Sequence, residues 1–221
     1  MTDSAERDKA PTPANADIEA RHAEVLGQHQ RLAPLERNAE SERMAYDYWC
    51  KLRRSIYGPD DKPPEGAKLP EIHFTMLRHP ELWERISELS VQLSGRGLIP
   101  IRDRELVILR TGWLCQAPFE WGEHVRIGRD LGLTSEDIER VIEGSTAEGW
   151  TEHERALLAA AEELHAGAMV SDATFEVLSR TMDDVQFFEL TVLIGQFTTV
   201  AYWQNALRLP LGQGNAGLAA R

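Results

Sequence analysis

Glu120 and His124 are four residues apart in a segment of helical character, so a carboxylate and an imidazole are expected on one helix face. At this spacing the two side chains can share a hydrogen bond or a ligand. Glu120 lies in the first turn after Pro118, where the helix dipole favours an ionised carboxylate that orients other groups. Because the unperturbed pKa of histidine lies near neutrality, His124 is the better candidate for general acid-base catalysis.

A second carboxylate, Glu105, precedes this pair within the segment RELVILRTGWLCQAPFEWGEHVRIGRDLGL, residues 104–133. The segment predicts two helices joined by a tight turn, so Glu105 would approach Glu120 and His124 across a helical hairpin. A buried carboxylate needs partners, and Glu105 therefore fits a structural link between the helices as well as it fits a catalytic role. His124 likewise fits a buried histidine that one of these carboxylates satisfies.

This hairpin resembles the core of the carboxymuconolactone decarboxylase and alkylhydroperoxidase D-like family. The redox branch of that family carries a Glu, eleven residues, a C-x-x-C pair, three residues and a His. In this chain Glu105 and His124 match the outer positions, whereas Ala117 and Glu120 stand where the two cysteines would be. Peroxide reduction needs a reactive thiolate and a resolving thiol nearby, and Cys115 has no neighbouring cysteine. Thiol peroxidase chemistry is therefore the least supported of the alternatives.

The resemblance covers about residues 74–209 and implies an all-α alkylhydroperoxidase D-like helical bundle that forms a homotrimer or homohexamer. It also implies a lyase that decarboxylates a small unsaturated lactone or cyclic carboxylic acid from aromatic compound degradation. Such a substrate contains its own electron sink, so no metal and no organic cofactor are expected. No second histidine has a close ligand spacing to His124, which also disfavours a metal site. The alternative is a non-catalytic member of the family that binds a small molecule or serves in assembly.

Arg104 and Arg110 are the candidates for a bidentate contact with a substrate carboxylate. They are six residues apart and share no helix face well, so at most one is expected to bind substrate. The hairpin and the last helix supply the other predicted substrate-binding residues, which are Trp113, Trp121, Thr198, Tyr202 and Asn205. The two tryptophans are also typical of a core. The other three residues form a polar stripe that we expect near a pocket or a subunit contact.

The elements that must position these residues are predicted to be helices, because no segment alternates apolar and polar residues as a strand would. Proline and glycine signals and capping patterns mark the helix ends. The expected helices cover residues 80–95, 101–115, 119–131, a segment opened by Thr134 and Asp137, a segment opened by Thr151 and Glu154, a segment capped by Ser171 or Asp172, and residues 184–209.

Three regions are expected along the chain: a disordered tail over residues 1–16, an N-terminal helical extension with a Pro-rich loop over residues 17–70, and the family's helical domain over residues 71–221. The extension should hold one or two amphipathic helices with a break near Pro34. The formal charge of -12 disfavours nucleic acid and anionic membranes as partners. With no candidate membrane span and no signal-peptide pattern, a soluble cytoplasmic protein is expected.

Overall fold

The computed structural model describes residues 15–63 and 65–221, and within these ranges every regular element is a helix. This confirms the all-α prediction. The expected disordered tail lies outside the described residues over positions 1–14, whereas positions 15 and 16 already belong to α1 (Asn15–Val25). None of the described helices is both long enough and apolar enough to cross a bilayer.

The predicted hairpin consists of α5 (Ile101–Leu114) and α6 (Pro118–Asp130). The turn between them is tight, because the Ala117 amide donates to the Gly112 carbonyl over 3.0 Å and Gln116 adopts the left-handed conformation with a φ of 47°. Proline is favoured in the first turn of a helix, which is where α6 holds Pro118. The turn therefore sets the two helices against each other and brings their buried faces together.

Helix α5 is the central element, and all of its residues from Arg104 to Trp113 are buried. A helix that is surrounded on every side needs no single apolar stripe. One face of α5 packs with α6, α7 (Ser135–Glu143) and the C-terminal turn η1 (Gly217–Ala219) around Leu106 and Leu109. The opposite face packs around Val107 and Ile108 with four other helices, which are α4 (Pro80–Gly95), α8 (Glu152–Gly167), α9 (Asp172–Leu178) and α10 (Asp184–Leu207).

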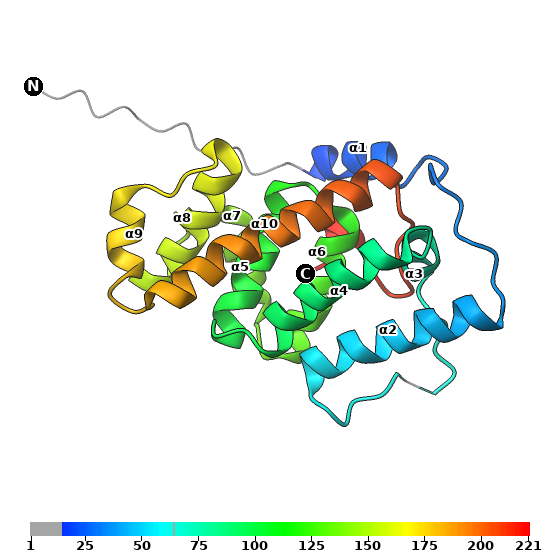
Figure 1. Cartoon of the computed structure of the whole chain (residues 1–221). Coiled ribbons are helices and arrows are strands. Elements are labelled where there is room, and N and C mark those ends of the chain that lie inside the picture. Colours follow the sequence, from blue (N-terminus) through cyan, green and yellow to red (C-terminus); the bar gives the residue numbers. More distant parts are fainter. Residues whose placement is uncertain (1–14, 64) are drawn as a thin grey trace, which may run out of the picture.

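The N-terminal extension packs against the domain (Figure 1). Helix α2 (Ala39–Tyr57) contacts α3 (Glu71–Met76) and α4 (Pro80–Gly95), around a small apolar cluster that includes Phe74 and Trp83. Helix α1 reaches the C-terminal turn, where His22 Nε2 accepts a hydrogen bond from the Leu218 amide over 2.9 Å. The break between α1 and α2 includes Pro34, as expected. The short elements α3 and η1 were not predicted.

The capping patterns locate several helix starts correctly. Thr134 with Asp137 and Thr151 with Glu154 form capping boxes at α7 and α8, and Ser171 caps α9. Helix α10 ends at Leu207, two residues before the expected end, because Arg208 adopts a left-handed φ of 56° and terminates the helix. This end of α10 lies near α1 (Figure 1).

Candidate active site

The structure brings Glu105, Glu120 and His124 together. The Nδ1 atom of His124 lies 2.8 Å from Glu105 Oε2, and its Nε2 atom lies 3.3 Å from Glu120 Oε1. The three residues are only 2%, 5% and 9% exposed, in chain order. They form a buried row of carboxylate, imidazole and carboxylate that joins α5 to α6, which we call the Glu–His–Glu row.

The two carboxylates determine the charge of His124. Burial alone would lower the pKa of His124, but the charges and hydrogen bonds of Glu105 and Glu120 outweigh it and raise the pKa to about 10. Burial also opposes the charged form of Glu105, yet His124 and Arg104 together lower the pKa of that carboxyl. At neutral pH His124 is therefore an imidazolium and a proton donor. The unperturbed pKa of histidine near neutrality, on which His124 was chosen as the acid-base candidate, is thus shifted upward by these neighbours.

Arg104 lies beside the row as a partner of Glu105. Its Nε donates to Glu105 Oε1 over 3.0 Å, and its Nη1 donates to the Ser94 carbonyl at the end of α4. Arg104 is buried, with an exposed fraction of 4%. These contacts make Arg104 a counterion for Glu105, which leaves the role in substrate binding a prediction.

The structure does not bring Arg110 to the row. Its Nε donates to Glu162 Oε1 over 2.9 Å, and its Nη1 donates to the carbonyls of Val141 and Ile142 over 2.9 and 3.0 Å. These carbonyls lie in the last turn of α7, where backbone acceptors lack partners within the helix. Arg110 is therefore engaged in joining α5, α7 and α8.

The two tryptophans lie in the apolar core. Trp113 and Trp121 are 2% and 0% exposed, and their ring centroids are 4.7 Å apart. The Trp121 indole N–H donates to the Ala220 carbonyl over 3.1 Å, which holds the C-terminal turn against α6. Both residues support the hairpin, and neither lines the cleft described below.

Helix α10 covers the Glu–His–Glu row with two residues that the sequence did not single out. Gln204 Nε2 donates to Glu120 Oε2 over 2.7 Å, and the ring of Phe197 meets that of His124 edge to face with centroids 5.1 Å apart. The polar stripe read from the sequence includes Asn205, one position beyond Gln204. A glutamine among the apolar residues of this helix is the sequence signal that could have predicted the contact between Gln204 and Glu120.

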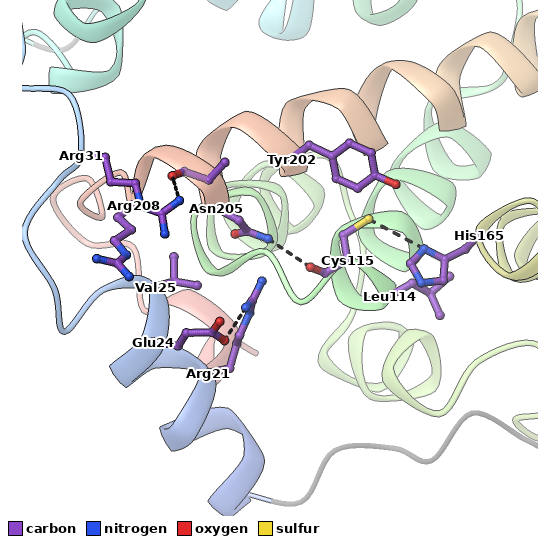
Figure 2. Close-up of a pocket in the computed structure, with 11 residues that line it drawn as sticks. Arg21, Glu24, Val25, Arg31, Leu114, Cys115, His165, Tyr202, Asn205 and Arg208 are labelled. Atoms are coloured by element: carbon purple, nitrogen blue, oxygen red, sulfur yellow. Dashed lines mark hydrogen bonds and ion pairs between the residues drawn. The ribbon is translucent and has the colours of Figure 1, made fainter.

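An open cleft of about 520 Å³ lies beside the end of α10 (Figure 2). Tyr202 and Asn205 line it, as do residues of α1, of the segment after α1, and of the ends of α5 and α8. Asn205 Nδ2 donates to the Cys115 carbonyl over 3.1 Å and so ties α10 to the hairpin turn. Thr198 does not line the cleft, and its hydroxyl donates to the Ile194 carbonyl over 2.8 Å.

The cleft and the Glu–His–Glu row are neighbours but do not merge. None of the three residues of the row lines the cleft. Cys115 does line it, and burial raises the pKa of this thiol to about 11, to which the nearby negative charge of Glu120 contributes. The charge of Glu120 therefore acts on a residue of the cleft lining, although Glu120 itself does not line the cleft. The described residues contain no group of three or more His, Cys, Asp and Glu side chains that could hold a metal ion.

Comparisons with known proteins give a family match over part of the chain and several solved structures of similar fold. Residues 79–163, which include the whole Glu–His–Glu row, match the carboxymuconolactone decarboxylase family model. A protein of unknown function from Agrobacterium tumefaciens, proposed as an AhpD antioxidant defence protein, is 25% identical, with a TM-score of 0.58 over 62% of this chain and 94% of that chain. No curated protein matches the chain.

Two further solved structures are similar in fold. A variant of the debrominase Bmp8 in complex with 2,3,4-tribromopyrrole has a TM-score of 0.69 at 16% identity, over 85% of this chain and 95% of that chain. An uncharacterised peroxidase-related protein from Silicibacter sp. TM1040 has a TM-score of 0.67 at 14% identity, over 84% and 93%. Residues 79–163 of this chain are therefore similar to the carboxymuconolactone decarboxylase family, and the chain has the helical fold of AhpD-like proteins.

Proposed function

We propose that this protein is a cofactor-independent carboxy-lyase that acts on a small unsaturated lactone acid or cyclic carboxylic acid, with His124 as the source of the proton. The observation that carries the proposal is the buried Glu–His–Glu row, in which two carboxylates hold His124 protonated at neutral pH. Ala117 and Glu120 occupy the positions of a redox thiol pair, which favours proton transfer over thiol chemistry.

The proposed reaction needs one proton and no external electron acceptor. The bond between the ring and the carboxylate breaks, carbon dioxide leaves, and the electron pair moves into the conjugated carbonyl as a dienolate. A proton then reaches the ring carbon and restores the neutral product, while solvent returns a proton to the enzyme. The positive charge of protonated His124 stabilises the dienolate electrostatically. The proton that His124 supplies then completes the reaction.

The proton leaves His124 through Nε2, because Glu105 holds Nδ1. Glu120 lies 3.3 Å from Nε2, and its charge acts on Cys115 in the cleft lining, so we assign Glu120 the relay of the proton toward a substrate in the cleft. Glu105 keeps the imidazole in one orientation throughout, with its other oxygen held by Arg104. In this scheme Glu105 is a positioning residue, and Glu120 and His124 carry the proton.

A second candidate function is binding without catalysis. The observation that favours it is the separation of the row from the cleft, because none of its three residues lines the cleft surface. In that case the Glu–His–Glu row serves only to join α5 and α6, and only the residues of the cleft contact the ligand.

The two candidates are separated by a turnover assay in deuterium oxide with a panel of unsaturated lactone acids. The lyase proposal expects carbon dioxide release with one deuterium incorporated into the product, and loss of both in His124→Gln and Glu120→Gln. Exposed Glu88→Gln serves as the control variant and should keep full activity. Folding of each variant is checked by circular dichroism and thermal melting. Acids that bind to the wild-type protein without release of carbon dioxide would instead support the non-catalytic candidate.

A further inference from the structure

We infer that the cleft beside α10 is a binding site for a small ring acid, in which Arg21, Arg31 and Arg208 hold the anionic group and the ring lies toward Tyr202. All four residues line the cleft. As a substrate site it rests on the proposed function, whereas binding by itself is measured without turnover.

The charge of the cleft is opposite to that of the chain. The three arginines share the cleft lining with one carboxylate, Glu24, although the formal net charge of the protein is -12. Positive charge that is gathered in a hollow of an acidic protein raises the local concentration of anions. Arg21 comes from α1, Arg31 from the segment after α1, and Arg208 from the end of α10, so only the folded chain brings them together.

Two of the arginines are held in place by contacts that leave donors free. Arg21 donates through Nε to the Gln116 carbonyl over 3.0 Å and through Nη1 to Glu24 over 2.6 Å. Arg31 donates through Nη1 to the Ala206 carbonyl over 3.0 Å. A guanidinium has five N–H donors, so both side chains keep donors for a ligand while their positions are fixed. Preorganised donors of this kind suit a planar carboxylate.

The Arg208 side chain makes the fewest polar contacts of the three arginines. Within residues 15–63 and 65–221 its guanidinium makes neither a hydrogen bond nor an ion pair with another side chain or carbonyl. Its backbone is in the left-handed region with a φ of 56°, which costs a residue other than glycine or asparagine roughly 1 kcal/mol. An arginine at this helix end therefore brings a charge to the cleft at a conformational cost.

The other end of the cleft is uncharged at neutral pH. In Figure 2 the arginines lie on one side of the view, and Tyr202, Cys115 and His165 lie on the other. Burial and the charge of Arg110 lower the pKa of His165, and the pKa of Cys115 is raised to about 11, so both side chains are neutral. Tyr202 presents an aromatic ring that is 65% exposed. A ligand with a carboxylate at one end and an unsaturated ring at the other fits a cleft that is positively charged at one end and neutral at the other.

The size of the cleft is compatible with such a ligand. Pockets that bind small molecules usually enclose about 300 to 1,000 Å³, and this cleft measures about 520 Å³. A single six-membered ring with one or two carboxylates fits within that volume. The neutral end disfavours a second anionic group there, so a monoanionic or closely spaced dianionic acid is the expected class.

Calorimetric titration of the full chain with benzoate, isophthalate and uncharged benzamide tests the inference. We expect the two acids to bind and benzamide to bind about tenfold more weakly or not at all, because a charged hydrogen bond is lost. Raising the salt concentration should weaken the binding of the acids but not that of benzamide. Arg208→Gln should weaken binding of the acids about tenfold, while exposed Arg85→Gln on α4 should leave it unchanged.

Equal affinity for benzamide and benzoate, or unchanged affinity for the acids in both Arg208→Gln and Arg31→Gln, would overturn the inference. Thermal melting with and without ligand shows that each variant is folded. If binding depends on Arg208 but no carbon dioxide is released from lactone acids, the proposed binding site is supported and the lyase proposal is contradicted. Turnover that is unaffected by Arg208→Gln would keep the lyase and reject this site.

Discussion

Gln204 Nε2 lies 2.7 Å from Glu120 Oε2, and this hydrogen bond joins the last part of α10 to the first turn of α6. The other oxygen of Glu120 contacts His124 at 3.3 Å. Both oxygens of this buried carboxylate are therefore engaged, one by the neighbouring turn of its own helix and one by a residue 84 positions away. Gln204 fixes the orientation in which Glu120 meets the imidazolium.

Replacing Gln204 with leucine should destabilise the protein by about 1 to 3 kcal/mol, because a buried carboxylate oxygen is left without its donor. Gln196→Leu is the matched control, since Gln196 is a buried glutamine on the same helix that donates to Ser90 Oγ over 3.2 Å and does not contact the row. Both variants should lose stability in urea unfolding. Only Gln204→Leu should lower kcat for lactone acids at nearly constant KM, and equal kinetics in the two variants would refute a positioning role.

Glu105→Gln should be among the most destabilising single changes in the chain. It leaves a buried imidazolium with one carboxylate and a buried Arg104 without its counterion, and breaking a buried pair of this kind costs about 3 to 5 kcal/mol. Glu88→Gln removes an exposed ion pair with Arg85 and should cost under about 1 kcal/mol. Urea unfolding of the two variants measures the difference. Similar small losses would show that Glu105 is not an essential partner of His124.

Arg110→Lys tests the structural assignment of a residue first predicted to bind substrate. A lysine cannot replace the planar fork that serves Glu162 and two carbonyls of α7, so the loss should be about 2 kcal/mol or more. Exposed Arg129→Lys should be nearly neutral in the same unfolding experiment. Affinity for isophthalate should be unchanged in folded Arg110→Lys. A selective loss of affinity without loss of stability would restore the substrate-binding interpretation.

His73 should make the protein sensitive to acid. Burial lowers the pKa of this histidine from 6.5 to about 4, and its Nδ1 has no hydrogen-bond partner among the described residues. Between these two pH values His73 binds a proton in the unfolded chain but stays neutral in the native state. The free energy of unfolding therefore falls as the pH drops, by up to about 3 kcal/mol. His73→Gln should reduce the loss between pH 6.5 and 4 in urea titrations. Parallel curves for wild type and variant would contradict this account.

The sequence predicts those parts of the site that depend on local spacing. The four-residue step from Glu120 to His124 places both on one face of α6, and the hairpin turn brings Glu105 to them. The capping pairs likewise locate the starts of α7 and α8, because a capping box is a local arrangement. The charge state of His124 could not be predicted from spacing, because it depends on how closely two carboxylates and the apolar surroundings approach the ring in three dimensions.

The residues that the sequence did not reveal are those whose partners lie far along the chain. Arg110 carries the same side chain as Arg104, yet one reaches α7 and the other reaches Glu105, and only packing decides this. Arg21, Arg31 and Arg208 are spread over the chain and show no motif. They meet because the N-terminal extension folds against the end of α10, which spacing alone does not predict.

The central claim is that two carboxylates hold a buried imidazolium at His124, and nitrogen NMR of the histidine ring tests it most directly. Spectra of the full chain recorded from pH 6 to pH 11 should show both nitrogens of His124 protonated at neutral pH, with deprotonation only near pH 10 and at a lower pH in Glu105→Gln. His124→Gln identifies the signals. A neutral His124 ring at pH 7, with one bare nitrogen, would contradict the proposed proton source.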